Sequence, residues 1–233
     1  MNKVQNLSGN DIEIKAEEFI SYFDKSILDK PQMTPYFSII ATLKDEFGIL
    51  VSLSTQLGFT ESGHKILGKF ISKPRAIMID EEVTETERLP FTLAHEIGHL
   101  VLHRNLKIDK EDYSEITDTE YDLVTGKKIL TTNRDWIEWQ ADKFASSFLL
   151  PRATFQNALI DIQRKMDITK NIGIVYVEKA DYSLRDFNKI KESLAKHYQV
   201  SKTVVEFRLS NLKLLIDRRM FNVKHVSEFL KEE

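Results

Sequence analysis

The segment from Pro90 to His103, PFTLAHEIGHLVLH, places ionisable side chains inside an otherwise apolar run. Its apolar residues recur with the period of an α-helix and cover most of the helix surface. These residues are Phe91, Ala94, Ile97, Leu100 and Val101. We therefore predict a largely buried helix over this segment.

Two histidines of this helix have the spacing of metal ligands. His95 and His99 are four residues apart, so they lie about 40° apart around the helix axis, on one face. At this spacing both imidazoles can reach a single Zn²⁺ at about 2.0–2.1 Å. Glu96 can accept a proton from a water on the metal. Because the chain has no Cys, a metal site must use His, Asp or Glu.

A third ligand is available in the segment from Trp136 to Leu150, which we predict to be a helix. Zinc hydrolases use three protein ligands and leave a position open for water, and two His with one Glu form an established set. Glu138 and Asp142 share a helix face: Glu138 can bind the metal, and Asp142 can accept the N–H of a ligand histidine and orient its ring. Alternatively, Asp135 and Glu138 have the spacing of a capping box, and Asp142 is a solvated helix residue. The histidine pair favours the metal interpretation.

The other histidines lack ligand spacing. His103 lies one turn beyond the pair, too far to share its metal, so we expect it to be packed or hydrogen-bonded in the core. A metzincin site is excluded, since it needs His and Gly where the chain has Asn105 and Leu102. No ligand spacing relates His64, His197 and His225 to any other residue.

The rest of the chain predicts a helix-rich α+β fold. Only 8 Gly and 5 Pro occur among 233 residues, about half the usual share. Helices are expected over 12–28, from Thr34 as N-cap to Gly48 as C-cap, and over 153–166. Short β-branched and aromatic runs at 49–53, 66–71 and 76–80 predict a small, mainly antiparallel three-stranded sheet. A further strand is expected at 172–177.

The polar connection over 104–134 is long for a compact domain, which is typical of a functional surface element. It contains a predicted hairpin at 121–130. Sequence gives no geometry for a group that would stabilise an oxyanion; Tyr121, Tyr176 and His64 are candidate donors.

The C-terminal part differs from the rest in charge. Residues 156–233 hold 15 Lys+Arg and 11 Asp+Glu, against 18 and 25 in residues 1–155. We predict a domain over 1–155 and a C-terminal helical region over 156–233, ending in a helix, a short turn and a last long helix that includes Leu215. This order of elements resembles a helix-turn-helix, and basic residues over 184–220 could contact DNA phosphates. They are Lys189, Lys191, Lys196, Lys202, Arg208 and Lys213. Packing on the core or binding of a protein substrate is favoured, because the second helix has no Asn or Gln cluster for reading bases.

The residues from Leu93 to His103, the pattern Glu138-xx-Ala141-Asp142-x-Phe144-Ala145, and Leu149-Leu150-Pro151 resemble the ImmA/IrrE family of zinc metallopeptidases. The resemblance covers about 35–155 in its order of elements. It implies a zincin-like core and a thermolysin-like site, with His95, His99 and Glu138 as zinc ligands and Glu96 as the catalytic base. Several members cleave a helix-turn-helix transcriptional repressor, often encoded beside them on a mobile element or in a stress regulon. The long 104–134 segment departs from the family pattern.

These observations predict a zinc-dependent endopeptidase that cleaves a protein substrate, most plainly a helix-turn-helix repressor, to relieve repression. The alternatives are a DNA-binding regulator with a non-catalytic metal site, and a partner that sequesters the repressor without cutting it. No apolar run approaches the roughly 18 residues of a membrane span, and the first residues lead into no apolar stretch, so we expect a cytoplasmic protein without membrane contact.

Overall fold

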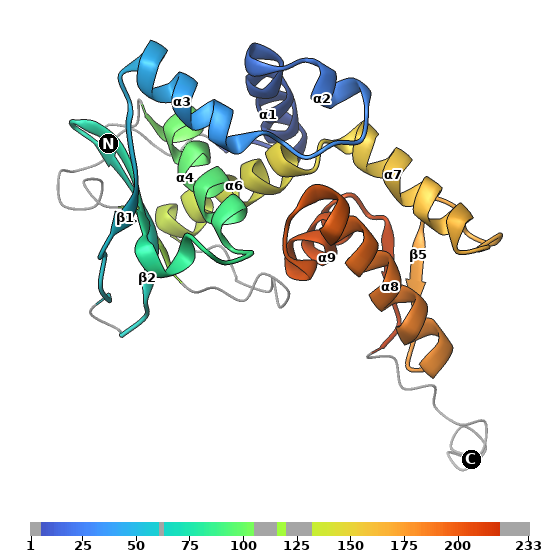
Figure 1. The fold of residues 1–233 in the computed structure, drawn as a ribbon. Helices are drawn as coiled ribbons and strands as arrows, with labels where there is room; N and C mark the ends of the chain where they lie inside the picture. Colours follow the sequence, from blue (N-terminus) through green and yellow to red (C-terminus); the bar gives the residue numbers. More distant parts are fainter. Residues whose placement is uncertain (1–5, 61–62, 105–115, 120–131, 220–233) are drawn as a thin grey trace.

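The computed structural model describes residues 6–60, 63–104, 116–119 and 132–219. The fold is helix-rich α+β, as predicted: a sheet lies at one end of the molecule, a layer of helices packs beside it, and a C-terminal helical part forms the other end (Figure 1). The helices are α1 (Gly9–Phe23), α2 (Ser26–Asp29), α3 (Tyr36–Phe47), α4 (Leu89–His103), α6 (Asn133–Leu149), α7 (Arg152–Lys165), α8 (Asp181–Tyr198) and α9 (Lys202–Asn211). The strands are β1 (Leu50–Thr55), β2 (Ile66–Ser72), β3 (Arg75–Asp80), β4 (Ile116–Thr119), β5 (Val175–Val177) and β6 (Leu215–Asp217), and a 3₁₀ turn covers Glu81–Val83.

The larger sheet contains the three predicted strands and a fourth. Its order is β1-β3-β2-β4, with β2 antiparallel to both β3 and β4 and β1 parallel to β3. The sheet is thus mixed but mainly antiparallel. The added strand β4 comes from the polar 104–134 segment, whereas the predicted hairpin at 121–130 lies outside the described residues.

The N-terminal helices pack over the central helices, with local corrections to the prediction. The expected helix over 12–28 is two helices, because Asp24 is extended between α1 and α2. Thr34 is not the cap of α3: its hydroxyl is buried and donates to the carbonyl of Phe148 (3.0 Å). Gly48 does end α3, in the left-handed conformation with φ of 62°.

The central helices α4 and α6 lie against each other, and α4 also packs on β2 and β3. A capping box begins α6, but its members are Thr132 and Asp135 rather than Asp135 and Glu138. Thr132 accepts from the Asp135 N–H (3.1 Å), and Asp135 accepts from the Thr132 N–H (3.0 Å). Glu138 is therefore not part of the cap.

The C-terminal part contains a helix pair and a small sheet. A turn with Gln199 in the left-handed conformation joins α8 to α9, whose N-cap is Ser201. The prediction of one long last helix is wrong, because the chain leaves α9 after Asn211 and turns through Lys213 at φ 58°. It then forms β6, which pairs in parallel with β5. Of the predicted strand at 172–177, only Val175–Val177 is a strand.

A buried ion pair joins this C-terminal part to the body. Arg208 of α9 is 1% exposed and contacts Glu13 of α1 through two guanidinium nitrogens. It also donates to the carbonyl of Leu150 (2.8 Å) and to Ser147 of α6 (3.0 Å). Burial disfavours the Glu13 carboxylate, but the hydrogen bonds and charge of Arg208 outweigh it and lower the pKa of Glu13. The side chain of Arg208 thereby links α9 to α1 and α6.

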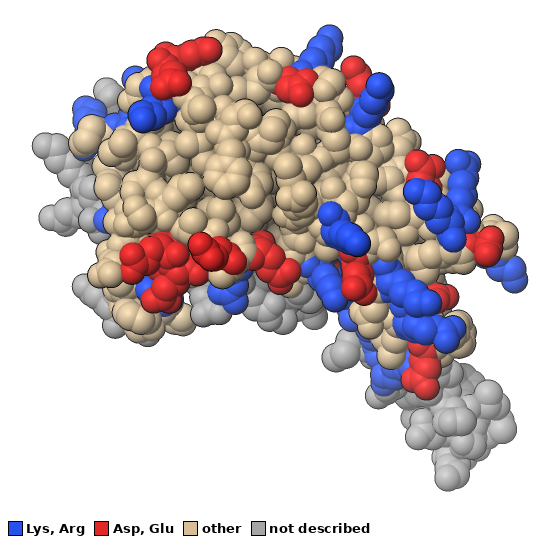
Figure 2. Space-filling model, viewed as in Figure 1, with Lys and Arg blue, Asp and Glu red and all other residues tan. Residues whose placement is uncertain are grey.

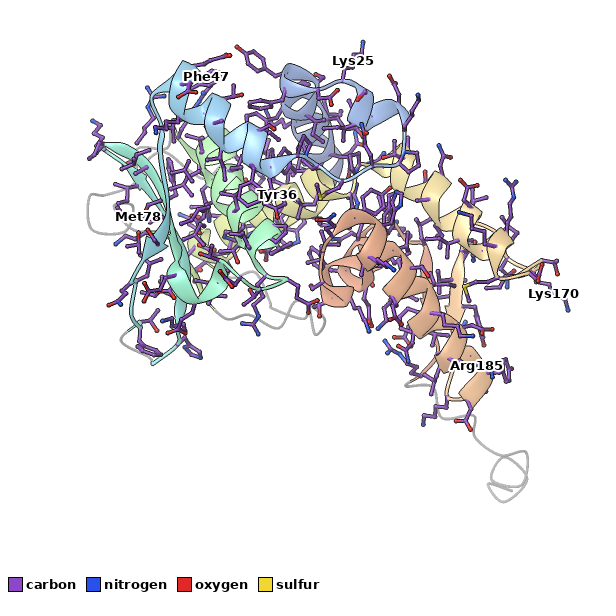
Figure 3. The ribbon with its side chains drawn as sticks, in the orientation of Figure 1. Lys25, Tyr36, Phe47, Met78, Lys170 and Arg185 are labelled. Carbon is purple, nitrogen blue, oxygen red and sulfur yellow. The ribbon has the colours of Figure 1, made fainter. Side chains whose placement is uncertain are left out.

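Charge is distributed unevenly over the surface. On the face drawn in Figure 2, basic side chains gather over the C-terminal part, and a group of acidic side chains lies at the level of the lower part of the sheet. Lys170 and Arg185 mark the C-terminal part, far from Met78 of β3 (Figure 3). Within the described ranges, no helix combines the length and apolarity needed to cross a membrane.

Candidate metal centre

The predicted metal-ligating histidines lie on α4, which is buried between the sheet and α6. His95, Glu96 and His99 are each at most 1% exposed. Gly98 makes the close crossing of the two helices possible, because a Cβ there would lie 3.2 Å from the Ala141 Cα of α6. The small residues of both motifs therefore bring α4 and α6 together where the ionisable residues lie.

Three side chains converge at this crossing. The Nε2 atoms of His95 and His99 are 2.9 Å apart, and the Glu138 Oε2 lies 3.2 Å from the former and 3.7 Å from the latter. Ligand atoms held about 2.05 Å from a tetrahedral ion are about 3.3 Å from each other. The three separations lie on both sides of that value, so the group fits a metal ion of zinc's size.

Asp142 lies behind His95, on the side away from the convergence point. Its Oδ1 is 2.9 Å from the His95 Nδ1. A carboxylate accepts only, so the His95 proton lies on Nδ1 and the Nε2 lone pair points toward His99 and Glu138. The structure thus brings together His95, His99, Glu138 and Asp142, as the sequence predicts.

The electrostatics of the group suit a cation. Burial lowers the pKa of His99, against the opposing influence of Glu138, so its ring is neutral at pH 7. Burial alone would raise the pKa of Glu138, but its interactions with the rings of His99 and His95 hold it well below its usual range. Two neutral imidazoles and one carboxylate are therefore the state available to a metal.

Glu96 is fully buried between α4 and strand β2. Gly68 of β2 leaves room for it, because a Cβ at this position would lie 2.7 Å from the Glu96 Oε1 and 2.9 Å from the Thr92 Cγ2. Gly68 was not predicted as a site residue. Its signal is a glycine inside a strand pattern, which marks close approach by another group.

His103 is hydrogen-bonded in the core, as expected, but with partners that the sequence did not reveal. Its Nδ1 lies 3.0 Å from the His99 Nδ1, and its Nε2 lies 3.1 Å from Gln140 Oε1 of α6. Burial lowers the pKa of His103 to about 3, so the ring is neutral. Gln140 was missed, although it lies between Glu138 and Asp142.

The remaining candidates lie elsewhere. His197 is exposed and its Nε2 is 3.1 Å from the carbonyl of Pro31, and Tyr176 donates to Glu178 (3.2 Å). His64 is exposed in the segment before β2. Tyr121 and His225 lie outside the described residues.

Comparison with known proteins agrees with the fold. The family model of the M78 peptidases, described as the IrrE N-terminal-like domain, matches residues 44–210. A search of the curated proteins finds no match. The matched range runs from the end of α3 through α4 and α6 into α9, and so crosses the predicted boundary at 155, which stays a prediction. Because this range is more than half of the chain, the protein belongs to the M78 family of metallopeptidases, the family of the IrrE N-terminal-like domain.

Proposed function

We propose that the protein is a zinc-dependent endopeptidase in which His95, His99 and Glu138 bind Zn²⁺ and Glu96 is the catalytic base. The convergence of the three ligand atoms at the α4–α6 crossing is the observation that carries this proposal. Two imidazoles and one carboxylate are a known zinc set that leaves a fourth position open. Asp142 supports the assignment, because it orients His95 as carboxylates do in zinc enzymes.

The residues around the centre have separate roles in peptide hydrolysis. Zn²⁺ in this site would supply Lewis-acid chemistry, lowering the pKa of a water and polarising the scissile carbonyl. Glu96 takes the proton of the attacking water and gives it to the leaving amine. Gly68 lets the Glu96 carboxylate occupy its place beside β2. Asp142 fixes the ring of His95.

The family implies a protein substrate, and we propose that it is a helix-turn-helix transcriptional repressor. This identity rests on the resemblance to ImmA/IrrE peptidases, several of which act on such repressors. Cleavage would relieve repression, and a repressor substrate would place the enzyme in the cytoplasm.

Zinc analysis and a cleavage assay test the proposal. The protein should hold about one zinc per chain. If a helix-turn-helix repressor is encoded beside its gene, the protein should cut that repressor into fragments that mass spectrometry identifies. Glu96→Gln should abolish cleavage while zinc content and far-UV circular dichroism stay unchanged. Glu46→Gln is the matched control, because Glu46 is exposed on α3. Full activity of Glu96→Gln, or absence of zinc from the wild type, would refute the proposal. A repressor that is bound but intact after long incubation would favour sequestration.

DNA binding through 184–220 is the weaker alternative. Arg208 cannot face phosphates, because it is buried against Glu13, and Lys191 contacts Glu206 at 2.6 Å. Lys196 and Lys202 are exposed and could still contact DNA. Duplex binding no stronger than that of a charge-matched control protein, across a range of salt concentrations, would remove this alternative.

A further inference from the structure

His103 occupies the buried end of α4 with a polar atom opposite each of its ring nitrogens. Nδ1 faces the His99 ring at 3.0 Å, and Nε2 faces the side chain of Gln140 at 3.1 Å. We propose that His103 and Gln140 are positioning residues that keep the His99 proton on Nδ1 and thereby keep its Nε2 available to the metal. This inference rests on the proposed function, because it assumes a metal at His95, His99 and Glu138.

The proton positions follow from counting donors and acceptors. A neutral imidazole has one N–H donor and one acceptor nitrogen. If the His99 Nε2 binds a metal, this nitrogen must be unprotonated. The proton of the neutral His99 ring therefore lies on Nδ1. That N–H points at the His103 Nδ1, 3.0 Å away, which must therefore accept. The proton of His103 is then on Nε2.

Gln140 completes the chain from the opposite helix. Its Oε1 faces the His103 Nε2, so an acceptor stands where the proton of His103 requires one. Gln140 is 1% exposed and lies two residues after Glu138 on α6. The helix that offers the carboxylate ligand thus also sets the proton position of the second histidine ligand.

The reverse arrangement shows why the amide matters. If the Gln140 amide turned its NH₂ toward His103, the His103 Nε2 would accept and its Nδ1 would carry the proton. The His99 Nδ1 would then accept, and the His99 proton would move to Nε2, where it would block metal binding. The orientation of one buried amide therefore selects between a metal-binding and a non-binding state of His99.

Metal affinity measured against a chelator tests this role. His103→Phe keeps a buried ring but removes both hydrogen bonds, and Gln140→Leu removes the acceptor alone. Each should weaken Zn²⁺ binding by about 10–100-fold, the usual effect of losing a partner of a metal-bound histidine. Gln140→Glu supplies an acceptor that cannot donate while it is ionised, so it should bind Zn²⁺ more tightly at pH 8 than Gln140→Leu does. His197→Phe, which removes an exposed histidine outside the centre, is the control.

The position of the proton on the His103 ring is a second observable, and a role in packing alone would not fix it. In the zinc-loaded wild type, ¹⁵N NMR should find His103 protonated at Nε2 and unprotonated at Nδ1. If His103→Phe does not fold by circular dichroism, Gln140→Leu and this spectrum carry the test. Zinc binding by the wild type together with unchanged affinity in both variants, or with a proton on the His103 Nδ1, would overturn the inference alone. A wild type that binds no zinc would overturn the proposed function instead.

Discussion

Replacing Arg208 by Met should strongly destabilise the fold at neutral pH, because the Glu13 carboxylate would remain buried without its main partner. Glu13 is 5% exposed, and its nearest other cation, Arg152, is 3.7 Å away and 42% exposed on its side chain. Breaking a buried pair from one side costs about 3–5 kcal/mol. The carboxylate can instead bind a proton on folding. The free-energy cost of this protonation is set by the difference between the pH and the ordinary pKa of 4.5. At pH 7 that is 2.5 pKa units, or about 3.4 kcal/mol.

The pH dependence has a definite sign. The pKa of Glu13 is lowered in the folded wild type, so its stabilisation is present above about pH 4.5 and is lost as the pH falls. In Arg208→Met the buried carboxyl is protonated on folding, so the deficit against the wild type should shrink from about 3–4 kcal/mol at pH 7 to about 1 kcal/mol at pH 5. For a chain of this size the neutral-pH deficit corresponds to about 6–16 °C in Tm.

Urea unfolding followed by circular dichroism measures these differences. Arg185→Met is the control: Arg185 is exposed on α8, and its loss should change stability by less than about 0.5 kcal/mol. The double variant Glu13→Leu with Arg208→Met removes the lone charge and should be more stable than Arg208→Met. The reasoning fails if Arg208→Met matches Arg185→Met at pH 7, or if its deficit does not change between pH 7 and pH 5.

Three further outcomes concern the centre and its surroundings. Gly68→Ala should displace the Glu96 carboxylate and lower peptide cleavage about 100-fold with zinc retained, whereas Gly9→Ala, where a Cβ meets nothing within 4 Å, should be neutral. Gly98→Ala should press α4 away from α6 and weaken zinc binding in chelator competition; unchanged affinity would contradict the crossing argument. Burial and the charge of Arg208 lower the pKa of Lys143 to about 8, so the unfolded chain binds more protons between pH 8 and 10.5. The stability of the wild type relative to Lys143→Met should therefore rise with pH across that window in urea titrations.

The candidate site could be predicted from sequence because its spacing is local within each helix. Four-residue steps put His95 with His99, and Glu138 with Asp142, on single helix faces, whatever the rest of the fold does. The meeting of the two faces was inferred from zinc chemistry, and the structure brings them together. Gln140 and Gly68 were missed because their contacts join separate elements, which no local period encodes.

The errors in the predicted fold also come from contacts between elements that are separate in the sequence. The hydrophobic spacing of Leu209, Leu212 and Leu215 matches a helix, yet pairing with β5 makes Leu215 part of a strand. Thr34 is a residue type that commonly caps helices, but its hydroxyl donates a hydrogen bond to the Phe148 carbonyl, more than a hundred residues away. The parallel pairing of β1 with β3 likewise depends on a partner that lies beyond β2 in the chain. Tertiary contacts override the local pattern in each case.

The two proposed histidine ligands have partners of different charge, and this difference is consistent with the charge of the whole centre. His95 is backed by the Asp142 carboxylate, whereas His99 is backed by neutral His103 and Gln140. With neutral imidazoles, the carboxylates of Glu138 and Asp142 would match the two positive charges of a zinc ion bound there. A third carboxylate behind His99 would leave the buried ligand group with an excess negative charge, which is costly to bury. The neutral side chains of His103 and Gln140 orient the His99 ring without that cost.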